Sequence, residues 1–112
     1  GRYKNLELDK TKDNLLEFQD MVVFNQGYIP SSFNTNESPD SIVYLSIDLN
    51  SAKPTLSSLE YFFPKLLPGG IILFDDYGQI GYSDTRKTID EFFHDKPGIL
   101  MKLPTSQAIF YR

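Results

Sequence analysis

The stretch that decides the fold is residues 42–78, which read IVYLSIDLN, then a helix-like segment closing in FFPKLLPGG, then IILFDDYG. Residues 42–47 and 71–74 are almost continuously apolar. Such runs are typical of strands that are covered on both faces. A strand, a helix and a second strand in this order predict two parallel neighbours in an α/β sheet.

Acidic side chains follow both of these strands at their carboxyl ends. Asp48 follows the first strand, and Asp75 and Asp76 follow the second. Ligands of open α/β sheets bind at this edge. Because parallel neighbours lie about 4.8 Å apart, Asp48 could share one small hard cation with Asp75 or Asp76. On spacing alone, an equally open interpretation is that these residues are helix caps and turn residues.

The helix between the two strands has recognisable ends. Ser51 or Asn50 is the expected N-cap, and Pro54 falls in the first turn, where a missing N–H costs little. Pro64 should kink or end the helix, and residues 68–70 (PGG) should turn the chain into the second strand. The predicted buried stripe consists of residues at spacings of three and four, namely Leu56, Leu59, Phe63 and Leu66.

The remaining segments predict further elements around this unit. We expect a helix over 11–18 with Leu15, Leu16 and Phe18 toward a core, a strand over 21–24, a loop over 28–40 with a helical turn near 31–33, a helix over 84–94, and strands over 99–103 and 108–111. The last two strands are separated by too few residues for a parallel crossover, so they predict an antiparallel hairpin. The expected fold class is α/β, a partial Rossmann-like sheet that is mostly parallel and closes with this hairpin.

Composition argues against several kinds of protein. The net charge of −4 is carried without a basic stripe, so we expect no nucleic-acid surface. No apolar run approaches the ~20 residues of a membrane span, and the first residues lack the apolar core of a signal peptide. The chain has no cysteine, which removes disulfides and zinc–thiolate sites and makes a reducing cytoplasm the default expectation.

The order of elements resembles the C-terminal half of a class I S-adenosylmethionine-dependent methyltransferase. More specifically, IDLNSAKPTLSSLEYFFPKLLPGGIILFDDYG, TRKTIDEFF and LPTSQAIFYR resemble the macrocin O-methyltransferase family, whose members methylate sugar hydroxyls on natural products and glycans. The upstream NLLEFQDMVVFNQGYIPSSF also fits that family, so the resemblance covers roughly residues 11–112. It implies a small-molecule or glycan acceptor.

The resemblance implies roles for individual residues. Asp48, Asp75 and Asp76 would hold Mg²⁺. Where many relatives carry a second acid as general base, this chain has Asn50, and an amide cannot accept a proton from a hydroxyl. The implied catalytic set is therefore Asp48, Asp76 and Asn50, with three alternatives for the proton: the metal acidifies the hydroxyl, Asp76 accepts its proton, or the acceptor differs.

The cofactor of this fold rests mainly on the first two strands and a glycine-rich turn, which have no counterpart here. The seven glycines form no G-x-G cluster, and Gly27 and Tyr28 would lie at the adenine end at most. We therefore expect residues 1–112 to be one domain, about half of the fold, that does not methylate by itself. The missing neighbour would expose the edge of strand 42–47. Either a homodimer forms through that edge or segment 21–24 covers it.

Two other functions stay open. A phosphoacceptor signalling domain also gathers acids around Mg²⁺, but its paired acids should follow the first strand rather than a later one. A non-catalytic α/β assembly module would keep only the scaffold. His94, the only histidine, is expected to interact with a helix dipole rather than with substrate. No role is assigned to Gln107 in the hairpin turn.

Overall fold

The computed structural model describes residues 2–34, 38–78 and 83–112. In chain order, the elements are helix α1 (Arg2–Asn14), 3₁₀ helices η1 (Leu16–Met21) and η2 (Ser31–Asn34), strand β1 (Ile42–Ile47), helix α2 (Ala52–Phe62), 3₁₀ helix η3 (Phe63–Lys65), strand β2 (Leu66–Phe74), helix α3 (Ser83–Phe93), and strands β3 (Ile99–Lys102) and β4 (Ala108–Tyr111). Part of the loop expected over 28–40 lies outside the described residues, and its predicted helical turn is present as η2.

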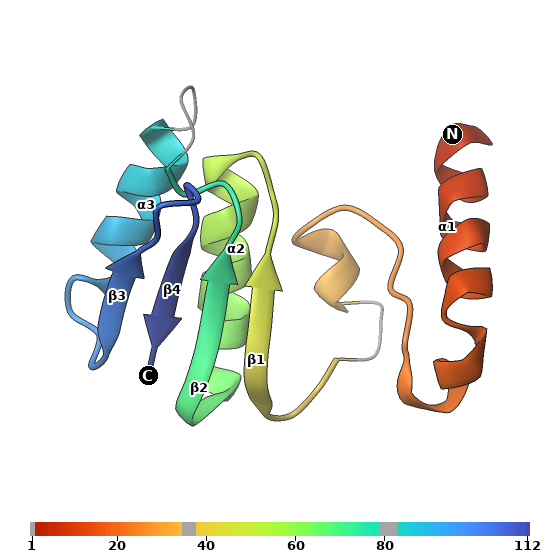
Figure 1. Cartoon of the computed structure of the whole chain (residues 1–112), viewed down its shortest axis with the longest axis horizontal. Helices are drawn as coiled ribbons and strands as arrows, with labels where there is room; N and C mark the ends of the chain where they lie inside the picture. The colour runs from red at the N-terminus through yellow and green to blue at the C-terminus, as the bar shows by residue number, and fades with distance from the viewer. Residues whose placement is uncertain (1, 35–37, 79–82) are drawn as a thin grey trace.

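The four strands form one sheet in the order β1-β2-β4-β3 (Figure 1). β1 pairs with β2 in parallel, and β4 is antiparallel to both of its neighbours, β2 and β3. β1, β2 and β3 therefore run in one direction and β4 alone is reversed. This confirms the predicted mostly parallel sheet with a closing hairpin.

The hydrophobic core lies between the sheet and helices α2 and α3, which lie behind the sheet in Figure 1. Its centre is aromatic: the rings of Phe93 in α3 and Phe110 in β4 stack with centroids 4.0 Å apart. Leu59 of α2 and Ile89 of α3 are buried against the same layer. The predicted stripe of α2 and η3 is confirmed, with Leu59, Phe63 and Leu66 buried and Leu56 half-buried.

The opposite face of the sheet is largely uncovered by the described residues. The strand register aligns two cross-strand rows on this face, Tyr44-Ile71-Tyr111-Ile99 and Ser46-Leu73-Ile109-Met101. The expectation that strand 42–47 is covered on both faces is wrong for this chain, since Tyr44, which lies on this open face, is 58% exposed. The apolar run was read correctly as a strand, but α2 and α3 cover only one side.

β1 is also an edge strand, with β2 as its only strand neighbour among the described residues. The strand expected over 21–24 is absent, so this segment does not extend the sheet. The helix expected over 11–18 is also misplaced, because α1 ends at Asn14 and η1 follows.

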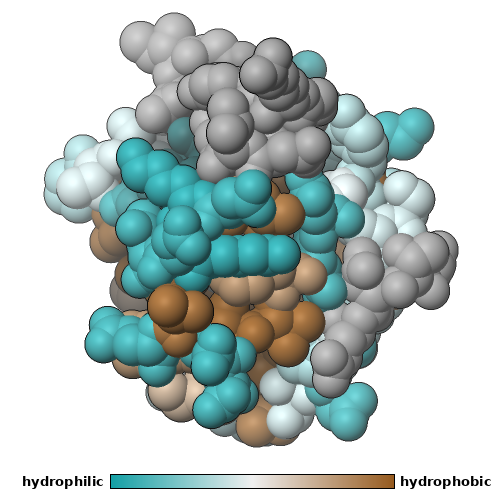
Figure 2. Space-filling model, turned by 90° about the vertical axis from the view of Figure 1, so that its right-hand side faces the viewer, coloured by the Kyte–Doolittle hydropathy of each residue, from teal (hydrophilic) through white to brown (hydrophobic). Residues whose placement is uncertain are grey.

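The residues expected to pack this first helix against the core do not do so. Leu16 and Phe18 are exposed and Leu15 is half-buried. Figure 1 shows α1 standing apart from the sheet beyond β1, and Figure 2 shows a hydrophobic area next to hydrophilic residues on this side of the molecule. An apolar sequence pattern cannot specify a core when no layer is present to receive it.

The PGG segment is part of β2 rather than the predicted separate turn. The β1–β2 register jumps from Ile42↔Leu66 to Tyr44↔Ile71, so these residues bulge out of the ladder. The bulge is held by the chain end, through Gly69 N to Arg112 O at 2.9 Å and Arg112 N to Gly70 O at 3.0 Å. Gly69 has φ +85°, a conformation that glycine adopts without steric cost.

The other helix ends agree with the predictions. Ser51 occupies the N-cap position of α2, although its side chain makes no capping hydrogen bond. α2 stops two residues before Pro64, which lies inside η3. The helix predicted over 84–94 is α3, and His94 lies just beyond its end.

Candidate metal centre

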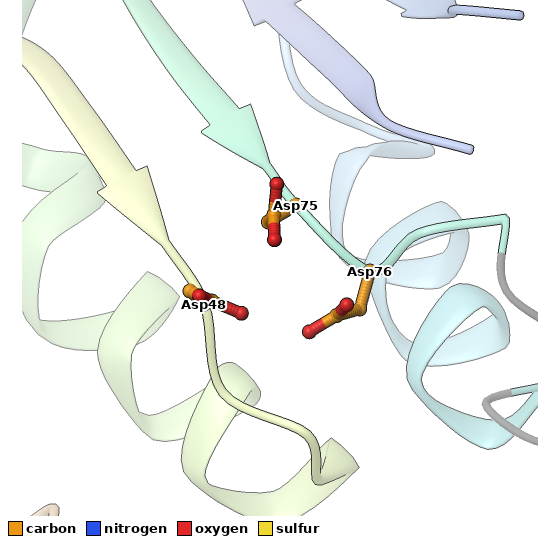
Figure 3. A group of neighbouring side chains, drawn as sticks. All are labelled: Asp48, Asp75 and Asp76. Carbon is orange, nitrogen blue, oxygen red and sulfur yellow. The ribbon is translucent and has the colours of Figure 1, made fainter. Parts of the chain in front are cut away.

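Three carboxylates meet at the carboxyl ends of β1 and β2. The parallel pair Ile47↔Phe74 closes the ladder, and Asp75 N donates a hydrogen bond to Ile47 O at 3.1 Å. Asp48, Asp75 and Asp76 follow directly, and each offers one oxygen within 4.8 Å of the others. Figure 3 shows the three side chains gathered in one space. The predicted proximity is present, and ligation of a metal by these residues stays a prediction.

The three side chains differ in their exposure to water. Asp48 is exposed, whereas Asp75 and Asp76 are half-buried. Asp76 Oδ2 is fully buried and has no hydrogen-bond partner in the described part of the chain. A buried carboxylate oxygen without a partner is costly, so this atom calls for a proton or a cation.

The pKa of the Asp76 carboxyl is raised above its ordinary value. Burial is the largest cause, followed by a hydrogen bond with Asp48 and then the negative charges of Asp48 and Asp75. Apolar side chains pack close to Asp76 and exclude water from it. They include Ile47, Phe74 and Ile89, which line a space of only about 10 Å³ beside the Asp76 carboxyl. The site therefore concentrates negative charge where water solvates it poorly.

The donor set fits a hard divalent cation. Carboxylate oxygens are the ligands that Mg²⁺ and Mn²⁺ take, and Mg²⁺ is commonly held by only one or two carboxylates together with waters. A cation would also compensate both the mutual repulsion and the unpartnered Oδ2 of Asp76. The residues present therefore suit such an ion.

Gln107 and Tyr77 hold the acidic loop in place. Gln107 Nε2 donates a hydrogen bond to Asp75 Oδ1 at 2.7 Å. The Tyr77 hydroxyl donates to Asp90 of α3, and the Tyr77 side chain is only 2% exposed. Burial, and then this hydrogen bond, raise the pKa of Tyr77. No local sequence pattern singles out Gln107, because its contact with Asp75 depends on the register between β2 and β4.

The other predicted site residues are not part of the carboxylate cluster itself. Asn50 is exposed between β1 and α2. Gly27 lines a separate cavity of about 250 Å³, whose walls include Phe33 and Phe62. Tyr28 is 76% exposed. Neither Gly27 nor Tyr28 lines the small space beside Asp76.

One protein family and several solved structures are similar to this chain. The family model described as Macrocin-O-methyltransferase (TylF) matches residues 4–110. Among solved structures, the O-methyltransferase NovP is similar with a TM-score of 0.58 and 23% identity, over 65% of this chain and 30% of that one. The apo structure of CalS11, a TDP-rhamnose 3'-O-methyltransferase of calicheamicin biosynthesis, is similar with a TM-score of 0.55 and 23% identity, over 63% of this chain and 32% of that one.

These likenesses confirm the predicted fold class. The chain spans about a third of the length of the solved structures that it matches. No curated protein is significantly similar to it. Among the described residues, no helix is long and apolar enough to cross a membrane.

Proposed function

The chain belongs to the macrocin O-methyltransferase family, and we propose that it carries the metal-binding and acceptor-binding part of an S-adenosylmethionine-dependent O-methyltransferase. The methyl acceptor would be a hydroxyl group of a sugar or glycan. The observation that supports this most directly is the convergence of Asp48, Asp75 and Asp76 within 4.8 Å. The acceptor class is supported by the sugar substrate in the name of CalS11.

Asp48, Asp75 and Asp76 would hold Mg²⁺. When bound, such a cation polarises an acceptor oxygen and stabilises negative charge that develops on it. The chain's own contribution is to present three carboxylates from two strand ends whose backbones are already joined by the hydrogen bond between Asp75 N and Ile47 O. Preorganised ligands need little rearrangement, and positioning supplies much of the rate in transfer reactions.

The proton of the acceptor hydroxyl needs a destination within this chain. Asn50 cannot accept it, because an amide is not a base. Asp76 is the candidate base within the cluster, because a carboxylate can accept a proton. A bound cation would in addition lower the pKa of the acceptor hydroxyl itself, which makes its proton easier to remove. Asn50, exposed at the same edge, would instead contact the acceptor through hydrogen bonds.

We propose that S-adenosylmethionine, which supplies the methyl group, is bound mainly outside residues 1–112. Gly27 and Tyr28 would contribute at most the adenine end, and the cavity that Gly27 lines is the feature that supports this. The cofactor-binding strands would pair with the free edge of β1 and extend the sheet. In their absence, two copies of the chain would pair through β1.

Calorimetric titration of the 112-residue chain with Mg²⁺ and with S-adenosylmethionine, in separate experiments, tests this proposal. We expect binding of Mg²⁺, no binding of the cofactor and no methyl transfer. Asp48→Asn should abolish the Mg²⁺ signal, and Asp20→Asn, which changes an exposed aspartate of η1, should leave it unchanged. Absence of Mg²⁺ binding would favour an assembly module, and labelling of an aspartate by acetyl phosphate would favour a phosphoacceptor domain.

A further inference from the structure

Gln107 lies directly opposite a proposed metal ligand. It precedes β4, whereas Asp75 follows β2, and the antiparallel pair Phe74↔Ala108 brings the two positions together. The side chain of Gln107 is half-buried, and its Nε2 lies 2.7 Å from Asp75 Oδ1. A residue from the last hairpin therefore contacts the acidic centre, although 32 positions separate the two in sequence.

The chemistry of the two partners sets the orientation of the amide. An ionised carboxylate only accepts hydrogen bonds, so the nitrogen end of Gln107 must face Asp75. The oxygen end then needs a donor, and Thr105 Oγ1 supplies one at 2.8 Å. Thr105, Gln107 and Asp75 thus form a directional chain in which each donor meets an acceptor.

The backbone of the hairpin turn is fixed to the acidic loop as well. Gly78 N donates to Ser106 O at 2.8 Å, and Leu103 N donates to Gln107 O at 2.8 Å. Ser106 has φ +66°, an uncommon conformation for a residue with a side chain, so the turn adopts a particular local shape. These contacts hold Gln107 in place from both sides.

We propose that Gln107 is a positioning residue that holds the Asp75 carboxylate in the orientation needed to ligate a divalent cation, with Thr105 fixing the amide. This inference rests on the proposed metal site. The hydrogen bond occupies one oxygen of Asp75 and leaves the other for the ion. Being neutral, the amide adds no fourth negative charge to the cluster of Asp48, Asp75 and Asp76.

Binding of Mn²⁺ alone to the 112-residue chain, followed by electron paramagnetic resonance, tests the role of Gln107. Gln107→Met keeps the length of the side chain but removes the donor, and we expect about 10-fold weaker binding or more, as for other residues that orient metal ligands. Gln107→Asn keeps the amide but shortens its reach, and should lose a similar factor. Gln19→Met makes the same chemical change on the exposed surface of η1 and should leave affinity unchanged.

A second readout needs no metal. In ¹⁵N-labelled, metal-free protein, the side-chain amide of Gln107 should exchange with water more slowly than that of Gln19. Thr105→Val and Asp75→Asn should each speed this exchange. Gln107 exchanging as fast as Gln19 would overturn the proposal whether or not the Met and Asn variants fold.

The two proposals fail in different ways. Wild-type protein that binds no Mn²⁺ overturns the metal assignment itself, and this inference with it. If wild-type protein and Gln107→Met bind Mn²⁺ with equal affinity, only the positioning role of Gln107 is overturned. Weakened binding in both Gln107 variants, together with slow exchange of the wild-type amide, would establish it.

Discussion

Asp76→Asn should make the metal-free protein more stable while removing its response to divalent cations. The substitution keeps the shape of the side chain and removes one negative charge from a cluster whose oxygens lie within 4.8 Å of one another. At that separation, Coulomb's law gives about 1 kcal/mol of repulsion per pair in bulk water and about 3.5 kcal/mol at an effective dielectric constant near 20.

The lower end of this range applies best, because Asp48 is exposed and solvent screens its charge. The amide nitrogen of the new side chain also adds a donor beside the two remaining carboxylates. We therefore expect Asp76→Asn to raise the free energy of unfolding by about 1–2 kcal/mol at pH 8 in EDTA. For a domain of this size, that is a rise of about 4–8 °C in Tm.

Thermal unfolding in EDTA and in excess Mn²⁺ measures both halves of the prediction. Wild-type protein should gain about 2.7 kcal/mol when Mn²⁺ is present at 100 times its Kd, because the ion binds only the folded state. Asp76→Asn should gain little, and Asp20→Asn, the exposed control in η1, should behave like wild type in both conditions. A variant that is less stable than wild type in EDTA, or that Mn²⁺ stabilises equally, would refute the reasoning.

Three further outcomes are expected. In EDTA, the raised pKa of Asp76 stabilises the folded protein at low pH. This stabilisation is lost as the pH rises from the unfolded-state pKa near 3.8 through the raised pKa of the folded state. In urea titrations over this pH range, Asp76→Asn should therefore lose less unfolding free energy than wild type. Gly98→Ala should cost at least about 2 kcal/mol, since Gly98 has φ +145° and a Cβ there would lie 2.4 Å from Phe110 Cζ. Gly69 has φ +85°, and a Cβ there would meet nothing within 4 Å, so Gly69→Ala should cost only about 1 kcal/mol of conformational strain. Equal urea midpoints for Gly98→Ala and Gly69→Ala would contradict the steric explanation. Tyr44→Lys on the exposed edge strand should weaken self-association in sedimentation experiments, and wild-type protein that stays monomeric would count against edge pairing.

Local sequence patterns are sufficient to predict the central part of the fold. β1, α2 and the closing hairpin follow from local patterns: a continuous apolar run, a stripe at helical spacing that ends near Pro64, and a connection too short for a crossover. The proximity of Asp48 and Asp75 also follows, because the strand ends of a parallel pair must meet at one edge of the sheet. These features depend on neighbours in sequence or on one strand pairing.

Features that depend on distant partners became visible only in the folded chain. The exposure of Tyr44 on an apolar strand follows from the uncovered face of the sheet, which no local pattern reports. Whether segment 21–24 forms a strand also depends on a distant partner, since a strand needs a neighbour to satisfy its backbone groups. In the folded chain this segment does not pair with the edge of β1.

The details of the acidic centre were likewise settled by packing. Asp76 Oδ2 is buried because residues of both strands and of α3 close around it, and Gln107 reaches Asp75 because the β2–β4 register places them opposite each other. Burial and cross-strand contacts arise from segments far apart in the chain. The sequence could therefore identify which side chains carry the chemistry, whereas their solvation and their hydrogen-bond partners emerged only once the layers were assembled.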